Sequence, residues 1–157
     1  MGMKIYQLKQ EQFLHINLEL AWNFFSNPAN LQKLTPEGMR FEILSDLEGV
    51  KAFPGQIINY KVNPFPMVRL RWTTEITQCE HETYFVDEQR FGPFSFWHHK
   101  HFFETDGEGV KMVDVVDYAL PFGFVGRLAH SIVVKQKLKS IFDYRRKLLD
   151  ERFKIEG

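Results

Sequence analysis

Hydrophobic and polar residues alternate with a period of two over much of the chain, which is typical of β-strands. The clearest example is residues 84–104, YFVDEQRFGPFSFWHHKHFFE, where a Gly-Pro pair separates two alternating runs. Residues two apart share a face of a strand, so the second run should place on one face Trp97, His99, His101 and Phe103. The other face receives His98, Lys100, Phe102 and Glu104. The first run groups Phe85, Asp87, Gln89 and Phe91. A carboxylate, an amide and two imidazoles among aromatic rings indicate a ligand pocket.

Seven segments have the composition of strands. They are residues 4–14, 39–44, 56–62, 68–78, 83–91, 94–104 and 110–120. Turn residues separate the later ones, at 53–55, 63–66, 92–93 and 106–109. These connections are too short to contain crossover helices, so we expect an antiparallel sheet.

Helical spacing replaces the alternation in three places. Residues 18–25 predict a short helix, and Pro28 is well placed to begin another that reaches residue 34, before residues 35–38 end it. Residues 122–153 predict a long helix without an internal proline. One apolar side of its first half contains Val125, Leu128, Ala129 and Ile132. The apolar side of its second half contains Leu138, Ile141, Phe142, Leu148 and Leu149.

The two apolar sides of the long helix differ in direction by more than a quarter-turn, and the change falls at residues 130–136. We interpret this as a helix of which one half packs against the cavity and the other against the sheet. A kink in the helix is compatible with this change of direction. The order of elements predicts an α+β helix-grip fold. In this fold a curved antiparallel sheet of about seven strands wraps around a long C-terminal helix, with two short helices after the first strand. Residues 1–157 should form a single domain.

Composition narrows the classes of function. Lys and Arg total 20, as do Asp and Glu, so no long-range field would attract nucleic acid or an anionic membrane. We find no signal peptide and no run of about 18 apolar residues, and Cys79 stands alone. We therefore expect a cytoplasmic protein without nucleic-acid partners or stable membrane insertion. The 16 phenylalanines would fill a large core or line an apolar cavity.

Several short motifs occur together along the chain. They are FSNPANL with LTP (25–31 and 34–36), RWTTEI (71–76), FVDEQ (85–89), GPF (92–94), WHHKH with FE (97–101 and 103–104), YALP (118–121), GRLA (126–129) and IFDYR (141–145). Together they resemble the SRPBCC superfamily, which includes START lipid-transfer domains, pollen allergens and polyketide cyclases. Within it, the chain is similar to a bacterial branch described only as ligand-binding. The resemblance covers about residues 5–153. It implies a deep cavity, the binding of hydrophobic small molecules and, in the members that are enzymes, one or two acid/base residues in the cavity.

The histidine pair His99-x-His101 is open to two interpretations. Imidazoles two apart on a strand can chelate a metal, but a third ligand would have to come from Asp87 or Glu75, and neither spacing demands it. We therefore predict no metal site and no cofactor, and hydrogen-bonded histidines instead. Asp87 beside a histidine could also act as an acid/base pair, with Asp87, His99 and His101 as the candidate catalytic residues.

Arg71 and Glu75 share a strand face, which would be a ligand-anion anchor if it points inward and a surface ion pair if it points outward. The second is our expectation. We interpret the basic residues of the last helix as a solvated face. They are Lys135, Lys137, Lys139, Arg145, Arg146 and Lys147. No serine or cysteine nucleophile motif or glycine-rich phosphate loop is present.

Our principal hypothesis is the binding of a hydrophobic small molecule, such as a lipid, a polyketide-like compound or an aromatic metabolite. An acid–base enzyme of the cyclase or dehydratase type is the second hypothesis, and a ligand-sensing module with a lid at residues 27–38 is the third. No partner protein is indicated. The predicted ligand-binding residues are Arg71, Trp72, Phe85, Asp87, Gln89, Phe91, Trp97, His99, His101, Phe103, Tyr118 and Leu128.

Overall fold

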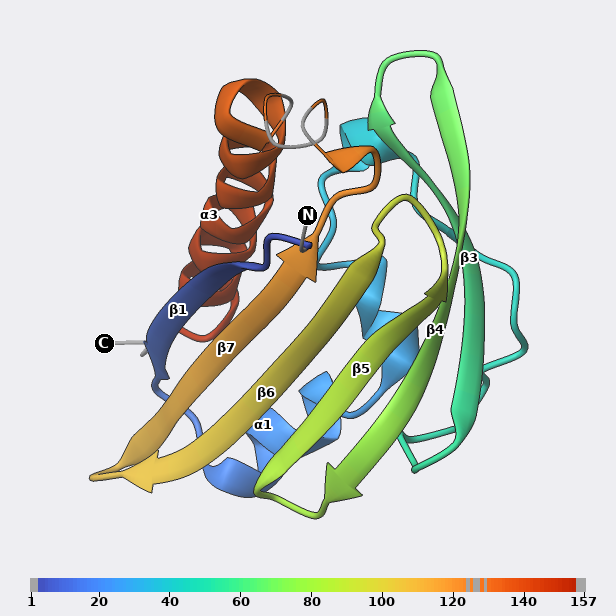
Figure 1. Ribbon diagram of the computed structural model, residues 1–157. Coiled ribbons are helices and arrows are strands. Elements are labelled where there is room, and N and C mark those ends of the chain that lie inside the picture. Colours follow the sequence, from blue (N-terminus) through green and yellow to red (C-terminus); the bar gives the residue numbers. More distant parts are fainter. Residues whose placement is uncertain (1–2, 124, 126–127, 129, 155–157) are drawn as a thin grey trace.

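A computed structural model describes residues 3–123, 125, 128 and 130–154. Its strands form one antiparallel sheet of seven strands in the order β1-β7-β6-β5-β4-β3-β2 (Figure 1). The strands are β1 (Tyr6–Leu14), β2 (Glu42–Ile43), β3 (Gln56–Phe65), β4 (Val68–Glu80), β5 (Tyr84–Phe91), β6 (Phe96–Asp106) and β7 (Gly109–Ala119). The predicted fold class is confirmed. The largest boundary error is in β2, which keeps only two residues of the predicted segment 39–44.

The alternation of side chains explains how the strands sit in the sheet. Along β3, Gln56, Ile58 and Tyr60 are buried, while Ile57 and Asn59 between them are exposed. Hydrophobic burial on one face fixes the register, because a slip of one residue would turn every side chain to the other face. The turn between β6 and β7 uses Gly107 with φ of 58°, a left-handed conformation that glycine adopts without steric cost.

Three short helical segments lie between β1 and β2 in the sequence. Helix α1 (Leu18–Phe25) has the predicted bounds, and the side chain of Asn17 caps it by accepting a hydrogen bond from the backbone N–H of Leu20 at 2.8 Å. The 3₁₀ segments η1 (Pro28–Leu31) and η2 (Glu37–Met39) come next. The second predicted helix is thus shorter than expected, and a further 3₁₀ turn forms at residues 37–39, where we expected the helix simply to end.

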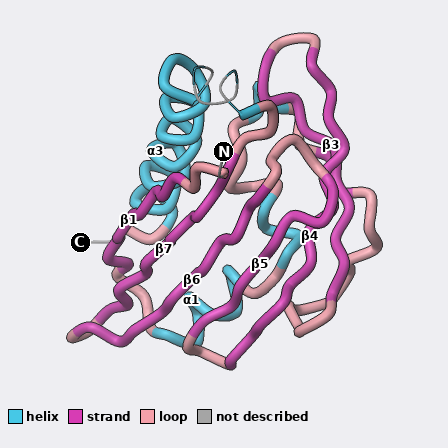
Figure 2. Tube along the Cα trace, viewed as in Figure 1, coloured by secondary structure: helices cyan, strands magenta, loops and turns pink. Residues whose placement is uncertain are grey.

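The C-terminal helix differs from the prediction in its first half. Helix α3 (Lys135–Arg152), cyan in Figure 2, is preceded by a π-helical segment, η3 (His130–Val134). This segment lies where the apolar stripe was predicted to change direction. A π-helical turn shifts the register of a helix face. The side chains of Val125, Leu128 and Ile132 are exposed, so the prediction that each half of the helix covers either the cavity or the sheet is wrong for these three side chains. Ala129 lies outside the described residues.

The second half of the helix packs against the rest of the fold. Leu138, Phe142 and Leu149 of α3 are buried, and α3 lies alongside β1 (Figure 1). Polar contacts fix this packing: the side-chain amide of Gln12 donates to the carboxylate of Asp150 at 2.8 Å. None of the helices among the described residues is long and apolar enough to cross a membrane.

Candidate functional site

A cavity of about 420 Å³ lies between the sheet and α3, as the fold predicted. Most of its wall is aromatic or aliphatic, with Tyr60 and Trp72 nearly parallel at 5.9 Å between ring centroids and Trp97 edge-on to Trp72 at 5.3 Å. The segment from Asn27 to Met39 forms part of the same wall. Such a wall favours a hydrophobic ligand, and its few polar groups would orient that ligand.

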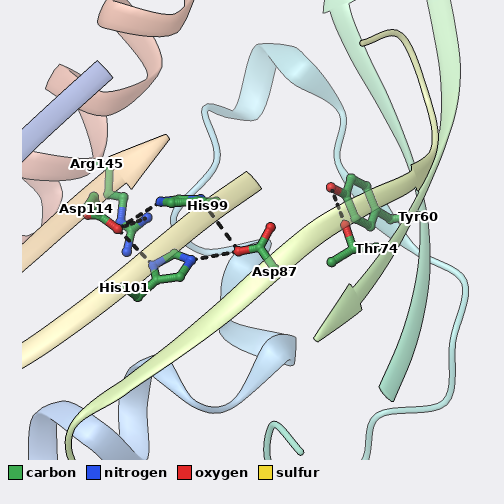
Figure 3. A network of polar contacts seen from close by, with 7 residues as sticks. All are labelled: Tyr60, Thr74, Asp87, His99, His101, Asp114 and Arg145. Atoms are coloured by element: carbon green, nitrogen blue, oxygen red, sulfur yellow. Dashed lines mark hydrogen bonds and ion pairs between the residues drawn. The ribbon is translucent and has the colours of Figure 1, made fainter. Parts of the chain in front are cut away.

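The principal polar group in the wall is formed by Asp87, His99 and His101, which all border the cavity. Asp87 on β5 stands directly opposite His99 on β6 in the strand pairing, and His101 lies two residues further along the same face. Nε2 of His101 and Oδ2 of Asp87 are hydrogen-bonded at 2.7 Å, and Nδ1 of His99 lies 3.6 Å from the same oxygen (Figure 3). The predicted meeting of these three side chains is thus present.

A second carboxylate lies behind the two imidazoles. Oδ1 of Asp114 on β7 is hydrogen-bonded to Nε2 of His99 at 3.0 Å and lies 2.8 Å from Nδ1 of His101 (Figure 3). Each imidazole therefore stands between the two carboxylates. The centroids of the two imidazole rings are 3.7 Å apart, and their planes are tilted by 36°. Arg145 of α3 completes the group, with Nη1 3.7 Å from Oδ1 of Asp114.

Asp114 was not among the predicted site residues, and the prediction for Arg145 was wrong. A signal for Asp114 exists, because it stands in phase with the apolar residues Val110, Met112 and Val116 of the inward face of β7. Arg145 was interpreted as part of a solvated basic face, but it is buried. It occupies the helical stripe of Phe142 and Leu149, at spacings of three and four residues.

Electrostatics give the members of the cluster different protonation behaviour. Burial and the nearby positive charge of His101 lower the pKa of His99. Burial by itself would also lower the pKa of His101, but the carboxylates of Asp114 and Asp87 outweigh it and raise that pKa. Burial opposes ionisation of Asp114 as well, yet Arg145 and the imidazoles hold its pKa well below the usual range. Burial would raise the pKa of Asp87, but the two imidazoles outweigh it and lower that pKa. The cluster thus favours the ionised form of both carboxylates, and His101 keeps its proton to a higher pH than His99 does.

The other predicted site residues, apart from Gln89, divide into three groups. Trp72, Phe85 and Trp97 line the cavity with the three cluster residues. Phe103 and Tyr118 are buried in the core beside it. Arg71 and Phe91 are exposed, Phe91 to 74%, so both point away from the cavity, and Leu128 is also exposed.

Gln89 and Glu75 have partners other than those expected. The side chain of Gln89 donates to the backbone oxygen of Phe94 at 2.7 Å and accepts from its N–H at 3.1 Å. It therefore closes the β5–β6 turn instead of joining the histidine cluster. Glu75 forms an ion pair with Arg90, so the expected partnership with Arg71 is replaced by one across neighbouring strands.

Comparison with known proteins identifies the fold. No protein-family model and no curated protein matches the sequence. Among solved structures, a protein of Thermus thermophilus is similar with a TM-score of 0.71 and 18% identity, covering 94% of this chain and 97% of that one. Major latex-like protein 151 of Panax ginseng gives 0.69 and 12%, covering 98% and 100%. Norcoclaurine synthase of Thalictrum flavum, solved with a transition-state analogue, gives 0.67 and 15%, covering 97% and 98%. The chain has the helix-grip fold that the SRPBCC resemblance implied.

Proposed function

We propose that this protein binds a hydrophobic small molecule, of the lipid, polyketide-like or aromatic class, in the cavity between the sheet and α3. The observation that carries the proposal is a cavity of about 420 Å³ with apolar walls and one concentrated polar cluster. Removal of about 200 Å² of apolar ligand surface from water would contribute about 5 kcal/mol at roughly 25 cal/mol per Å², before the cost of association.

The polar groups of the wall would set the orientation of the ligand. Its polar end would meet the edge of the cluster formed by Asp87 and His101, where a hydrogen-bonding group can pair with a carboxylate or an imidazole. The indole Nε1 of Trp72 is buried and has no hydrogen-bond partner among the described residues. Because a buried unpaired donor is costly, a carbonyl or ether oxygen of the ligand beside Trp72 would be stabilised.

The geometry also supports a second candidate function, acid–base catalysis on a bound carbonyl compound. His101 and Asp87 are in hydrogen-bond contact at 2.7 Å and both border open space in the cavity. A neutral imidazole beside a protonated one provides both a base and an acid. One would remove a proton from the carbon next to the carbonyl, and the other would donate a proton to the carbonyl oxygen.

The binding proposal is tested by filling the cavity. Ile58 lines the cavity and is 4% exposed, whereas its neighbour Ile57 points to the opposite face of β3 and is 48% exposed. Titration with 8-anilinonaphthalene-1-sulfonate, followed by its fluorescence, should show at least tenfold weaker binding for Ile58→Trp and unchanged binding for Ile57→Trp. Equal affinities in two variants that both unfold cooperatively would refute the proposal.

Catalysis needs a separate readout. In ²H₂O, exchange of the protons next to the carbonyl of small ketones, measured by NMR, should be faster with the wild type than with Asp87→Asn. Equal rates at background level would remove the second candidate while leaving the binding proposal intact.

A further inference from the structure

We propose that Asp87, His99 and His101 form a binding site for a divalent first-row transition-metal ion, with Asp114 as the outer carboxylate that orients both imidazoles. This goes beyond the proposed binding of a hydrophobic molecule and does not depend on it. In the sequence, a third ligand for the two histidines could come from Asp87 or Glu75, and neither spacing demanded it. The sheet register favours Asp87, because it places Asp87 opposite His99.

The three ligand atoms have the separations that a metal ion requires. One nitrogen of each imidazole and one oxygen of Asp87 lie within 4.8 Å of one another. Oδ2 of Asp87 is 2.7 Å from Nε2 of His101 and 3.6 Å from Nδ1 of His99. Metal–ligand bonds of about 2.0–2.2 Å at angles between about 90° and 110° place ligand atoms about 2.8–3.6 Å apart. Small side-chain rotations therefore bring the three atoms around one centre.

Asp114 prepares both imidazoles for this role. One nitrogen of each imidazole faces away from Asp87. Nε2 of His99 lies 3.0 Å from Oδ1 of Asp114, and Nδ1 of His101 lies 2.8 Å from the same oxygen. In the metal-free protein, Nε2 of His101 and Oδ2 of Asp87 share a proton at 2.7 Å. A metal ion would displace that proton, because ligands bind in their deprotonated form. The nitrogen of each imidazole on the side opposite Asp114 would then face the ion. A carboxylate behind a metal-bound histidine is the usual arrangement for fixing its tautomer and orientation.

The surroundings leave coordination positions open and specify the kind of metal. The three ligand residues border the cavity, so a bound ion would expose its remaining positions to a ligand there. Two imidazoles and one carboxylate suit Zn²⁺, Fe²⁺ or Co²⁺ better than Mg²⁺ or Ca²⁺, which prefer oxygen ligands. With Asp87 and Asp114 ionised and Arg145 charged, the metal-bound cluster carries one net positive charge. A carboxylate, enolate or hydroxide oxygen would balance it.

The experiment is calorimetric titration of the chelator-treated protein with Zn²⁺, together with the visible absorption of Co²⁺ as a geometric probe. We expect one equivalent of Zn²⁺ to bind and an absorption spectrum for Co²⁺ that shows nitrogen ligation. His99→Gln and Asp87→Asn should each weaken binding by at least about 100-fold. Asp114→Asn should weaken it by about 10–100-fold, because it removes the orienting carboxylate without removing a ligand.

A matched control lies one residue away. His98 is on the opposite face of β6 and pairs with Glu88 at 3.2 Å, so His98→Gln should bind Zn²⁺ as the wild type does. Cooperative thermal unfolding of each variant establishes that it is folded, and Asp87→Asn keeps the side-chain volume in case the histidine variants unfold. The site is refuted if the variants at residues 87 and 99 keep wild-type affinity, or if His98→Gln loses as much. Ile58→Trp should impair binding of the fluorescent probe but not of Zn²⁺, so the two proposals fail separately.

Discussion

Replacement of Asp114 by asparagine tests whether the buried carboxylate holds the site together. The side chain of Asp114 is 1% exposed, and its Oδ1 contacts both imidazoles and the guanidinium of Arg145. Asparagine keeps the shape but removes the negative charge. The amide oxygen of asparagine can accept a hydrogen bond from one imidazole. If the NH₂ group of asparagine pointed to the second imidazole, two donors would face each other.

The expected loss of stability in Asp114→Asn depends on which buried groups lose their partner. Removal of one partner of a buried ion pair costs about 3–5 kcal/mol, because the other charge stays buried without compensation. Arg145 keeps its contact with the ring of Phe25, at 5.5 Å from the centroid, and one hydrogen bond to the cluster survives. We therefore expect the lower end of the range, about 3 kcal/mol. For a domain of this size it corresponds to a fall in the melting temperature of about 6–12 °C.

The control is Asp117→Asn, on the same strand but at the partly exposed face. Asp117 pairs with Lys100 at 2.8 Å and is 20% exposed, so its loss should cost about 0–1 kcal/mol. Urea unfolding at neutral pH in the presence of chelator compares the two variants. A loss below about 1 kcal/mol for Asp114→Asn, or equal losses for both variants, would refute the view that Asp114 compensates a buried positive charge.

Three further predictions concern protonation and packing. In metal-free protein, an NMR titration should place the pKa of His101 above the ordinary value of 6.5 and that of His99 below it; a shared value would contradict the assignment. The lowered pKa of Asp114 gives stability that is fully present above the ordinary value of 3.8 and lost as the pH falls through the lower folded value. Acid unfolding of the wild type should therefore be steeper than that of Asp114→Asn, and parallel curves would disprove it. Gly109→Ala should lower the stability by about 1–3 kcal/mol, because its Cβ would stand 2.5 Å from a backbone oxygen of β1. The control is Gly38→Ala, whose Cβ would meet no atom within 4 Å. Equal melting temperatures of the two variants would disprove the clash.

Much of the fold could be predicted because its cause is local. Alternation identified the strands, helical spacing located α1, and Pro28 located the start of η1. The same periodicity placed Asp87, His99 and His101 on one face, which the pairing of β5 with β6 brings together. Phe91 does not follow this alternation, because the register of the β4–β5 pairing shifts between Thr73 and Thr74 of β4, near the end of β5.

The remainder of the site depends on contacts between distant segments. Asp114 lies in phase with an apolar strand face, but only the tertiary arrangement shows that two imidazoles and Arg145 surround it. Arg145 occurs among other basic residues, so composition made it resemble a solvated side chain, although its helical phase is that of Leu149. The first half of the C-terminal helix was misjudged for a related reason. Helical periodicity identifies apolar side chains that group together, but it does not show whether anything packs against them.

The most direct test of the central claim is a contact between a bound molecule and the inward methyl groups. In protein with labelled isoleucine δ1 methyls, nuclear Overhauser effects from bound 8-anilinonaphthalene-1-sulfonate should reach Ile58, Ile76 and Ile141, which line the cavity. Ile57, on the exposed face of β3, should show none. Effects confined to Ile57 and the exposed Ile132 would place the probe on the surface and contradict a ligand-binding cavity.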